Sequence, residues 1–118
     1  MRYNVHYSPE FQNDLDNIAD YIVSEFCDPV AAERITNGIV DATEMLEEYP
    51  ESGRKVFLPN GMDSGYRFVV YRDYVAFYRF EWNEVYVARA INTRQDYMRI
   101  LFPWLRNNSP NDDGNNES

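Results

Sequence analysis

The stretch from Tyr66 to Leu101 constrains the fold more than any other part of the chain. It contains three short runs rich in aromatic and β-branched residues, YRFVVY, YVAFYRFE and EVYVARAI, separated by the dipeptides Arg72–Asp73 and Trp82–Asn83. Runs of this composition with two-residue spacers predict a three-stranded antiparallel meander. A short helical pattern, NTRQDYMRIL, ends the stretch.

The first fifty residues predict a strand followed by two helices. Residues 3–7 alternate apolar and polar side chains, which is typical of a half-buried strand. Ser8–Pro9 and Asp28–Pro29 are each a capping residue followed by a proline, and each precedes an apolar stripe with helical spacing. We therefore expect helices that begin at the two prolines, the first ending near Phe26 and the second before Pro50. A connection this short predicts an antiparallel helix hairpin.

The remaining segments have no regular pattern. Residues 51–64 contain Gly53, Pro59, Asn60 and Gly61 and predict a loop, which carries Arg54 and Lys55. Residues 103–118 consist mainly of Asn, Asp, Ser and Gly, and we expect a disordered tail. The chain is therefore predicted to form one α+β domain over residues 1–102. Its order is strand, helix, helix, three-stranded meander and short helix, with the helix hairpin packed on one face of the sheet.

The charge is distributed unevenly along the chain. The net charge is −9, which argues against direct nucleic-acid binding by this chain alone. Residues 1–53 carry twelve acidic and two basic side chains, whereas residues 54–106 carry nine basic and five acidic ones. An anionic partner should therefore meet the second half of the chain. No apolar run approaches the ~18 residues that span a bilayer, and one cysteine allows no internal disulfide, so we expect a cytoplasmic protein.

The meander can be sorted into two faces. Two-residue turns place Tyr71 opposite Tyr74 and Glu81 opposite Glu84. Alternation then gives one almost purely apolar face, which we assign to the helix hairpin: Tyr66, Phe68, Val70, Val75, Phe77, Tyr86, Ala88 and Ala90. The other face mixes arginines and tyrosines with apolar residues: Arg67, Val69, Tyr71, Ala76, Tyr78, Phe80, Val87, Arg89 and Ile91.

Arginine and tyrosine are frequent anchors of protein interfaces, so the second face is predicted to be a partner-binding surface. In the alternative interpretation, Arg67 and Arg89 pair with carboxylates from Asp63 or from the closing helix.

The end of the meander carries a family resemblance. The run Val87-Ala88-Arg89-Ala90-Ile91-Asn92-Thr93-Arg94-Gln95-Asp96, together with Tyr66-Arg67 and the segment from Tyr74 to Arg79, resembles the ParE/RelE toxins of bacterial type II toxin–antitoxin modules. The resemblance covers residues 1–102. Asn92 stands where the family motif has a histidine, and Gln95 replaces an arginine.

The two branches of this family imply different functions. ParE-like members poison DNA gyrase by binding, without chemistry of their own, whereas RelE-like members cleave mRNA on the ribosome. The resemblance would assign a RelE-like catalytic role to Arg67, Arg94 and Tyr97. Two basic positions of that branch are absent here, because Val69 and Tyr74-Val75 stand in their place. We therefore favour the ParE branch, which implies no enzymatic activity.

The resemblance also implies partners. A cognate antitoxin should neutralise the toxin, in a module of the plasmid-stabilisation type, and the target is gyrase or, in the alternative, the ribosome with its mRNA. The predicted contact residues for target or antitoxin are Arg67, Tyr71, Tyr78, Arg89, Arg94 and Tyr97. A third hypothesis is a degenerate, non-toxic module that still binds an antitoxin.

Other candidates favour structural interpretations. A Cys/His nucleophile pair would require His6 and Cys27 to meet in space. We instead expect a strand-surface histidine and a small apolar residue at a helix end. Asp16 and Asp20 share a helical face without histidine or cysteine, which favours a solvated acidic surface over a metal site. We expect no cofactor and no bound metal.

Overall fold

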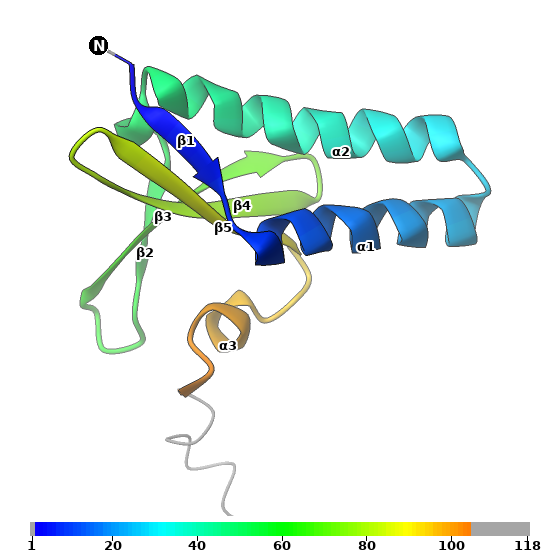
Figure 1. The fold of residues 1–118 in the computed structure, drawn as a ribbon. Helices are drawn as coiled ribbons and strands as arrows, with labels where there is room; N and C mark the ends of the chain where they lie inside the picture. The colour runs from blue at the N-terminus through cyan, green and yellow to red at the C-terminus, as the bar shows by residue number, and fades with distance from the viewer. Residues whose placement is uncertain (1, 105–118) are drawn as a thin grey trace, which may run out of the picture.

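The fold is α+β, as predicted from the sequence (Figure 1). The computed structural model describes residues 2–104, which form a mixed sheet in the order β1-β5-β4-β3-β2. The strands are β1 (Asn4–Tyr7), β2 (Arg54–Phe57), β3 (Asp63–Tyr71), β4 (Tyr74–Glu81) and β5 (Glu84–Asn92). The helices are α1 (Pro9–Phe26), α2 (Pro29–Glu44) and α3 (Tyr97–Leu101), with 3-10 turns at Met45–Glu47 and Pro50–Ser52. No helix within residues 2–104 is long and apolar enough to cross a bilayer.

Both helices of the hairpin begin where the sequence predicts, and α1 ends at Phe26 as expected, whereas α2 ends at Glu44 and a 3-10 turn, Met45–Glu47, fills the space before Pro50. The Ser8 hydroxyl accepts a hydrogen bond from the Phe11 amide at 2.9 Å, and the Asp28 carboxylate accepts one from the Ala31 amide at 2.9 Å. Each cap is followed by a proline in the first turn, where the missing N–H costs no helical hydrogen bond. Cys27 ends α1 in a left-handed conformation, with φ of 51°, and so reverses the chain into α2.

The meander register is confirmed at both turns. Tyr71 lies opposite Tyr74, and Glu81 lies opposite Glu84. Arg72 and Trp82, the first residue of each turn, have positive φ values of 53° and 59°. A positive φ in this position matches the twist of the flanking strands, so both tight turns form without glycine.

The sheet has two more strands than the predicted meander. β1 pairs in parallel with β5, and β2 pairs antiparallel with β3 at the opposite edge. The prediction of a loop over residues 51–64 is therefore wrong for β2. The strand is only four residues long, its register shifts between Lys55 and Phe57, and Val56 is its one buried residue. A short, irregular edge strand of this kind lacks the alternation on which the prediction depends.

The assignment of the sheet faces is wrong. The helix hairpin packs on the face predicted to bind a partner, and its core combines helix and sheet side chains: Phe11, Ile39, Leu46, Ala76, Tyr78, Val85, Val87 and Ala90. β5 has a bulge in which Ala88 has no partner, because Tyr78 lies opposite Val87 and Phe77 lies opposite Arg89. Because of this bulge, Ala90 faces the helices and Ile91 faces away from them.

The second face of the sheet is covered by α3. Val56, Phe77, Ile91 and Phe102 form a separate buried cluster on this face. Figure 1 shows α3 on the side of the sheet away from α2. Of the tail predicted over residues 103–118, only Pro103 and Trp104 are described, and the rest lies outside the described residues.

Tyr78 is fully buried, which corrects its prediction as a surface contact. Its hydroxyl donates a hydrogen bond to the Pro50 carbonyl oxygen and accepts one from the Gly53 amide at 3.0 Å. A Cβ at Gly53 would lie 2.3 Å from this hydroxyl, so glycine is required there for the close approach. Tyr78 therefore anchors the connection between α2 and β2 to the centre of the sheet.

Replacing Tyr78 with phenylalanine should lower the free energy of unfolding by about 2 kcal/mol, because the change leaves the buried Pro50 carbonyl and Gly53 amide without their partner. Burial raises the pKa of Tyr78, so its contribution is present below its unfolded pKa and is lost as the pH rises through the folded pKa. Urea denaturation of the wild type and of Tyr78→Phe, at neutral and at alkaline pH, measures the loss of stability and its pH dependence. Tyr49→Phe, at an exposed tyrosine, is the control, and an equal loss in both variants would contradict the prediction.

Candidate functional site

The predicted contact residues Arg89, Arg94 and Tyr97 lie where β5 ends and the chain turns into α3. Side chains and backbone groups hold this turn in place. The Asn92 side-chain oxygen accepts a hydrogen bond from the Arg94 amide at 2.9 Å, and the Thr93 amide donates one to the Asp73 carbonyl oxygen at 2.8 Å. The backbone at Arg94 is therefore held by the end of β5 and by the turn between β3 and β4.

An open groove with a volume of about 540 Å³ separates α1 from this turn. It brings together Arg89, from the bulge of β5, and Arg94, from the turn. The groove is lined further by polar, aromatic and aliphatic side chains: Asp14, Asn17, Ile18, Tyr21, Tyr74, Ala90, Ile91, Asn92, Gln95 and Ile100. Its walls therefore offer both hydrogen-bonding groups and aromatic rings to a ligand.

Arg89 is held by Asp14 of α1. The Arg89 Nε donates to Asp14 Oδ2 and its Nη2 donates to Asp14 Oδ1, each at 2.8 Å. The Ala90 amide also donates to Asp14 Oδ2, at 2.9 Å. The hydrogen bonds to Asp14 raise the pKa of Arg89 above its ordinary value. Arg89 thus pairs with a carboxylate as the alternative interpretation held, but the partner lies in α1 and not at Asp63 or in α3.

Arg94 is exposed and differs from Arg89 in its contacts. Among residues 2–104 it makes no ion pair, since Asp96 pairs with Arg99 at 3.3 Å. The Asp96 carboxylate also accepts a hydrogen bond from the Arg99 amide and so caps α3. Arg94 is therefore the cation of this groove whose charge is available to a partner.

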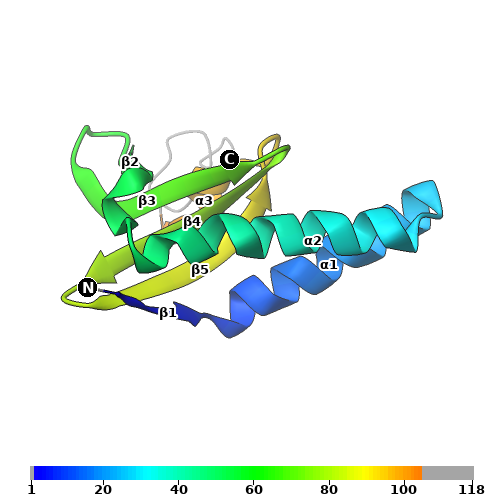
Figure 2. The same ribbon diagram turned by 90° about the horizontal axis from the view of Figure 1, so that it is seen from above.

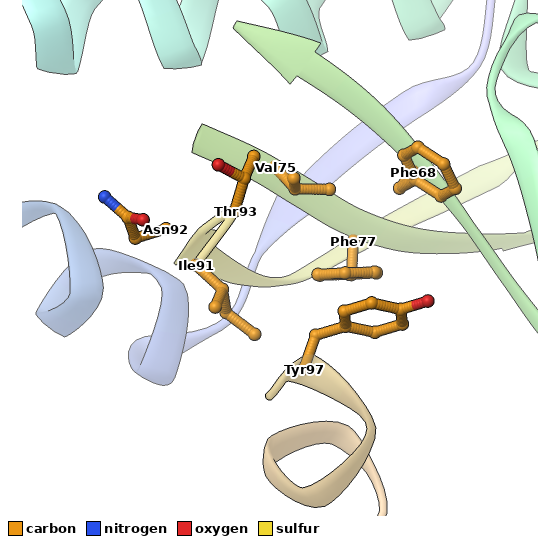
Figure 3. A pocket seen from close by; sticks show the side chains of 7 residues that line it. All are labelled: Phe68, Val75, Phe77, Ile91, Asn92, Thr93 and Tyr97. Atoms are coloured by element: carbon orange, nitrogen blue, oxygen red, sulfur yellow. The ribbon is translucent and has the colours of Figure 1, made fainter. Parts of the chain in front are cut away.

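A small apolar cavity lies on the α3 side of the sheet (Figure 3). Its volume is about 90 Å³, and it is lined by Phe68, Val75, Phe77, Ile91, Asn92, Thr93 and Tyr97. The Tyr97 ring stacks on Phe77 with centroids 5.3 Å apart and an angle of 26° between the planes. Figure 3 shows the Tyr97 hydroxyl pointing away from Asn92 and Thr93. Because Tyr97 is 41% exposed, a partner can reach both its ring and the cavity beside it.

Arg67 lies elsewhere. Its guanidinium donates to the carbonyl oxygens of Gly53 at 2.9 Å and Glu51 at 3.2 Å, and lies 5.6 Å from the centre of the Phe80 ring. Phe80 packs against the core under the helix hairpin, whereas Tyr97 packs on the opposite face. Arg67 and Tyr97 therefore do not converge on one reacting group.

Tyr71 also has a structural position. Its ring packs against α2 at Gly38, where a Cβ would lie only 2.0 Å from the ring. Arg72 lies over the same ring, 5.5 Å from its centre, and donates a hydrogen bond to the Tyr71 hydroxyl at 3.2 Å. The six predicted contact residues thus divide into two groups. Arg89, Arg94 and Tyr97 lie at one end of the sheet, and Arg67, Tyr71 and Tyr78 hold the fold together.

His6 and Cys27 are separated by the whole of α1, which has eighteen residues. His6 Nε2 lies 2.5 Å from Glu84 Oε1 of the neighbouring strand. This hydrogen bond to His6 lowers the pKa of Glu84. Cys27 is exposed at the far end of the helix. In the part of the chain that the structure describes, no three His, Cys, Asp or Glu side chains are grouped to hold a metal ion.

Comparison with known proteins identifies the family. Residues 5–97 match the family described as the ParE toxin of the type II toxin–antitoxin system, parDE. The chain belongs to this ParE toxin family. It is a type II toxin–antitoxin toxin with the ParE/RelE fold.

Two solved structures of toxin–antitoxin systems share the fold of this ParE-family toxin. A chain of the chromosomal ParDE system from P. aeruginosa is 21% identical, with a TM-score of 0.66, and the match covers 77% of this toxin and 96% of that chain. A chain of the RelBE2 complex from Mycobacterium tuberculosis is 18% identical, with a TM-score of 0.57, and the match covers 78% of this toxin and 92% of that chain. No curated protein sequence matches this toxin significantly.

Sequence reasoning did not assign several polar and aromatic residues to the groove of this ParE-family toxin, among them Asp14, Asn17, Tyr21 and Tyr74. A signal for Asp14 is present in the sequence. It comes three residues after Phe11 and four before Ile18, so it lies on the apolar stripe of α1. An acidic residue on a buried stripe needs a cation opposite, and Arg89 on an otherwise apolar strand is the natural partner.

Proposed function

We propose that this toxin acts by binding and inhibiting DNA gyrase and that a cognate antitoxin neutralises it. The observation that carries the proposal is the arrangement of Arg94 and Tyr97. An exposed arginine that makes no ion pair within residues 2–104 lines the groove on one side of the turn, and a half-exposed tyrosine borders an apolar cavity on the other. Arginine and tyrosine beside a pocket are typical anchors of a protein–protein interface.

The same geometry argues against mRNA cleavage. Phosphoryl transfer without a metal needs several fixed charges directed at one phosphate. Arg67 donates to two backbone carbonyl oxygens on the helix-covered face, and Arg89 is neutralised by Asp14, so neither is directed at the reacting group that Tyr97 could reach. The arrangement supports a binding protein better than a ribonuclease.

A supercoiling assay with purified gyrase and relaxed plasmid tests the proposal. The wild-type toxin should inhibit supercoiling, and Arg94→Ala and Tyr97→Ala should each raise the inhibitory concentration about tenfold or more, because each removes an interface anchor. Trp82→Ala, at the turn before β5, is the matched control, since it removes an exposed aromatic side chain at the opposite end of that strand. Circular dichroism should show the same fold for all four proteins.

Absence of inhibition at micromolar toxin would contradict the gyrase target. Translating ribosomes treated with the same preparation then distinguish the alternatives, since mRNA cuts would indicate the RelE-like activity. If neither occurs and induced expression leaves growth unchanged, the protein is a non-toxic module.

The sheet offers a place for the antitoxin. β2 lies at the edge of the sheet and carries the exposed basic residues Arg54 and Lys55. An extended segment can add to such an edge through backbone hydrogen bonds, and an acidic side chain in that segment would be complementary to Arg54. Lys55 already lies 3.4 Å from Asp63 of β3. A small protein encoded beside the toxin should therefore co-purify with it and restore supercoiling in the gyrase assay.

A further inference from the structure

Residues 92–95 form the turn that leaves β5, and this turn carries Arg94. Figure 2 shows the segment, in yellow and orange, beside the turn that joins β3 to β4. Residues 93–97 are all exposed. Burial in the core therefore does not fix the conformation of this segment, and its hydrogen bonds must do so.

Asn92 accepts two hydrogen bonds within the turn. Its backbone carbonyl oxygen accepts one from the Gln95 amide at 3.0 Å, which closes a turn of four residues. Its side-chain oxygen accepts one from the Arg94 amide at 2.9 Å. Asparagine often stabilises turns in this way, because its side chain is long enough to reach the backbone two residues on.

Gln95 closes the turn from the other side. Its side-chain oxygen accepts a hydrogen bond from the Asn92 amide at 3.2 Å, so the two residues are bonded to each other in both directions. This bond requires an acceptor in the side chain of residue 95. Arginine has only donors, so the arginine that Gln95 replaces in the family motif could not make it.

We propose that Asn92 and Gln95 are positioning residues for Arg94. Together they fix the backbone of the turn, and with it the direction in which the Arg94 side chain leaves the chain toward the groove. The inference rests on the proposed function, in which Arg94 is an anchor for gyrase. A turn with other accessible conformations would present Arg94 correctly for a fraction of the time, and the apparent affinity would fall by that fraction.

Direct contact with the partner is the competing role for the same two side chains. Asn92 and Gln95 both line the groove beside Arg94, so either could touch gyrase itself. The two roles differ in their dependence on Arg94. A positioning residue acts through the Arg94 side chain, whereas a contact residue contributes to affinity without it.

The supercoiling assay measures the effect of the turn on inhibition. Asn92→Ala and Gln95→Met should each raise the inhibitory concentration about fivefold, the effect expected from the loss of one neutral hydrogen bond. Asn92→Ser should recover part of the loss, because a hydroxyl can accept the same bond more weakly. Gln12→Met is the matched control, since it changes an exposed glutamine of α1 that does not line the groove.

The Arg94→Ala background separates positioning from contact. Without the Arg94 side chain there is nothing to position, so neither Asn92→Ala nor Gln95→Met should raise the inhibitory concentration further. A fivefold effect that persists in this background would overturn the proposal, because the side chains would then contact gyrase directly.

Amide hydrogen exchange of the toxin alone tests the turn without gyrase. The Arg94 amide should exchange about fivefold faster in Asn92→Ala than in wild type, and the Asn92 amide about fivefold faster in Gln95→Met, because each loses its acceptor. Equal exchange of these amides in wild type and variants would overturn the proposal. Absence of gyrase inhibition by the wild type would contradict the target alone, and hydrogen exchange would still decide whether Asn92 and Gln95 hold the turn.

Discussion

Replacing Asp14 with alanine should lower the free energy of unfolding by about 3 kcal/mol, the lower end of the range for breaking a buried ion pair. The Asp14 side chain is 10% exposed and accepts three hydrogen bonds, two from Arg89 and one from the Ala90 amide. Without it, a positive charge and a buried amide are left unpaired. The loss lies at this lower end because the Arg89 side chain is 31% exposed and water can reach the guanidinium.

Urea denaturation at neutral pH measures this loss. Asp16→Ala is the matched control, because it removes an exposed carboxylate from the same helix and should change stability by less than about 0.5 kcal/mol. Arg89→Met in the Asp14→Ala background should recover part of the loss, since it removes the unpaired charge. If Asp14→Ala lowers the free energy of unfolding no more than Asp16→Ala does, the Asp14–Arg89 ion pair does not stabilise the packing of α1 against β5.

The sequence contains enough local information for most of the fold. The starts of α1 and α2 follow from a capping residue and a proline, and Ser8 and Asp28 make the expected hydrogen bonds. The meander register follows from turn length, and both predicted pairs of residues are present. β2 is the exception, because an edge strand of four residues is specified by its pairing with β3 and not by its own composition.

The sheet faces show where local information ends. Both faces of the meander are largely apolar, so alternation separates two sets of residues without saying which one the helices cover. The decisive contacts are tertiary: Tyr71 fits against Gly38, and Tyr78 reaches the Pro50 carbonyl oxygen. The bulge at Ala88 also shifts the pairing of β4 with β5 by one residue, and the turn residues give no sign of this shift.

The candidate site could be predicted in part. The motif at the end of β5 identifies Arg94 and Tyr97, and the structure places both beside open surface. The motif also includes Arg89, but its charge is neutralised by Asp14, which lies 75 residues earlier in the chain. A pairing over this separation depends on the packing of α1 against β5, so single-strand patterns cannot distinguish an exposed arginine from a paired one.

Whether Gly38→Ala stabilises or destabilises the protein depends on the neighbouring Tyr71 ring. In an isolated helix, replacing glycine with alanine stabilises by about 1 kcal/mol. Here the added Cβ would lie 2.0 Å from Cζ of Tyr71 and 2.4 Å from its hydroxyl oxygen, so the ring must leave its place against α2. We therefore expect Gly38→Ala to destabilise the protein by about 2 kcal/mol, a typical cost of overpacking.

The Tyr71→Ala background separates the two effects. Without the ring, the Cβ at residue 38 has room, and Gly38→Ala should stabilise that variant by up to about 1 kcal/mol through helix propensity. Denaturation of the four proteins of this cycle gives the coupling between the two residues. Asn37→Ala, at the exposed neighbouring position, should behave alike in both backgrounds. If Gly38→Ala were stabilising with Tyr71 present, the ring would not pack on α2, and Tyr71 would be available as the surface contact that the sequence predicts.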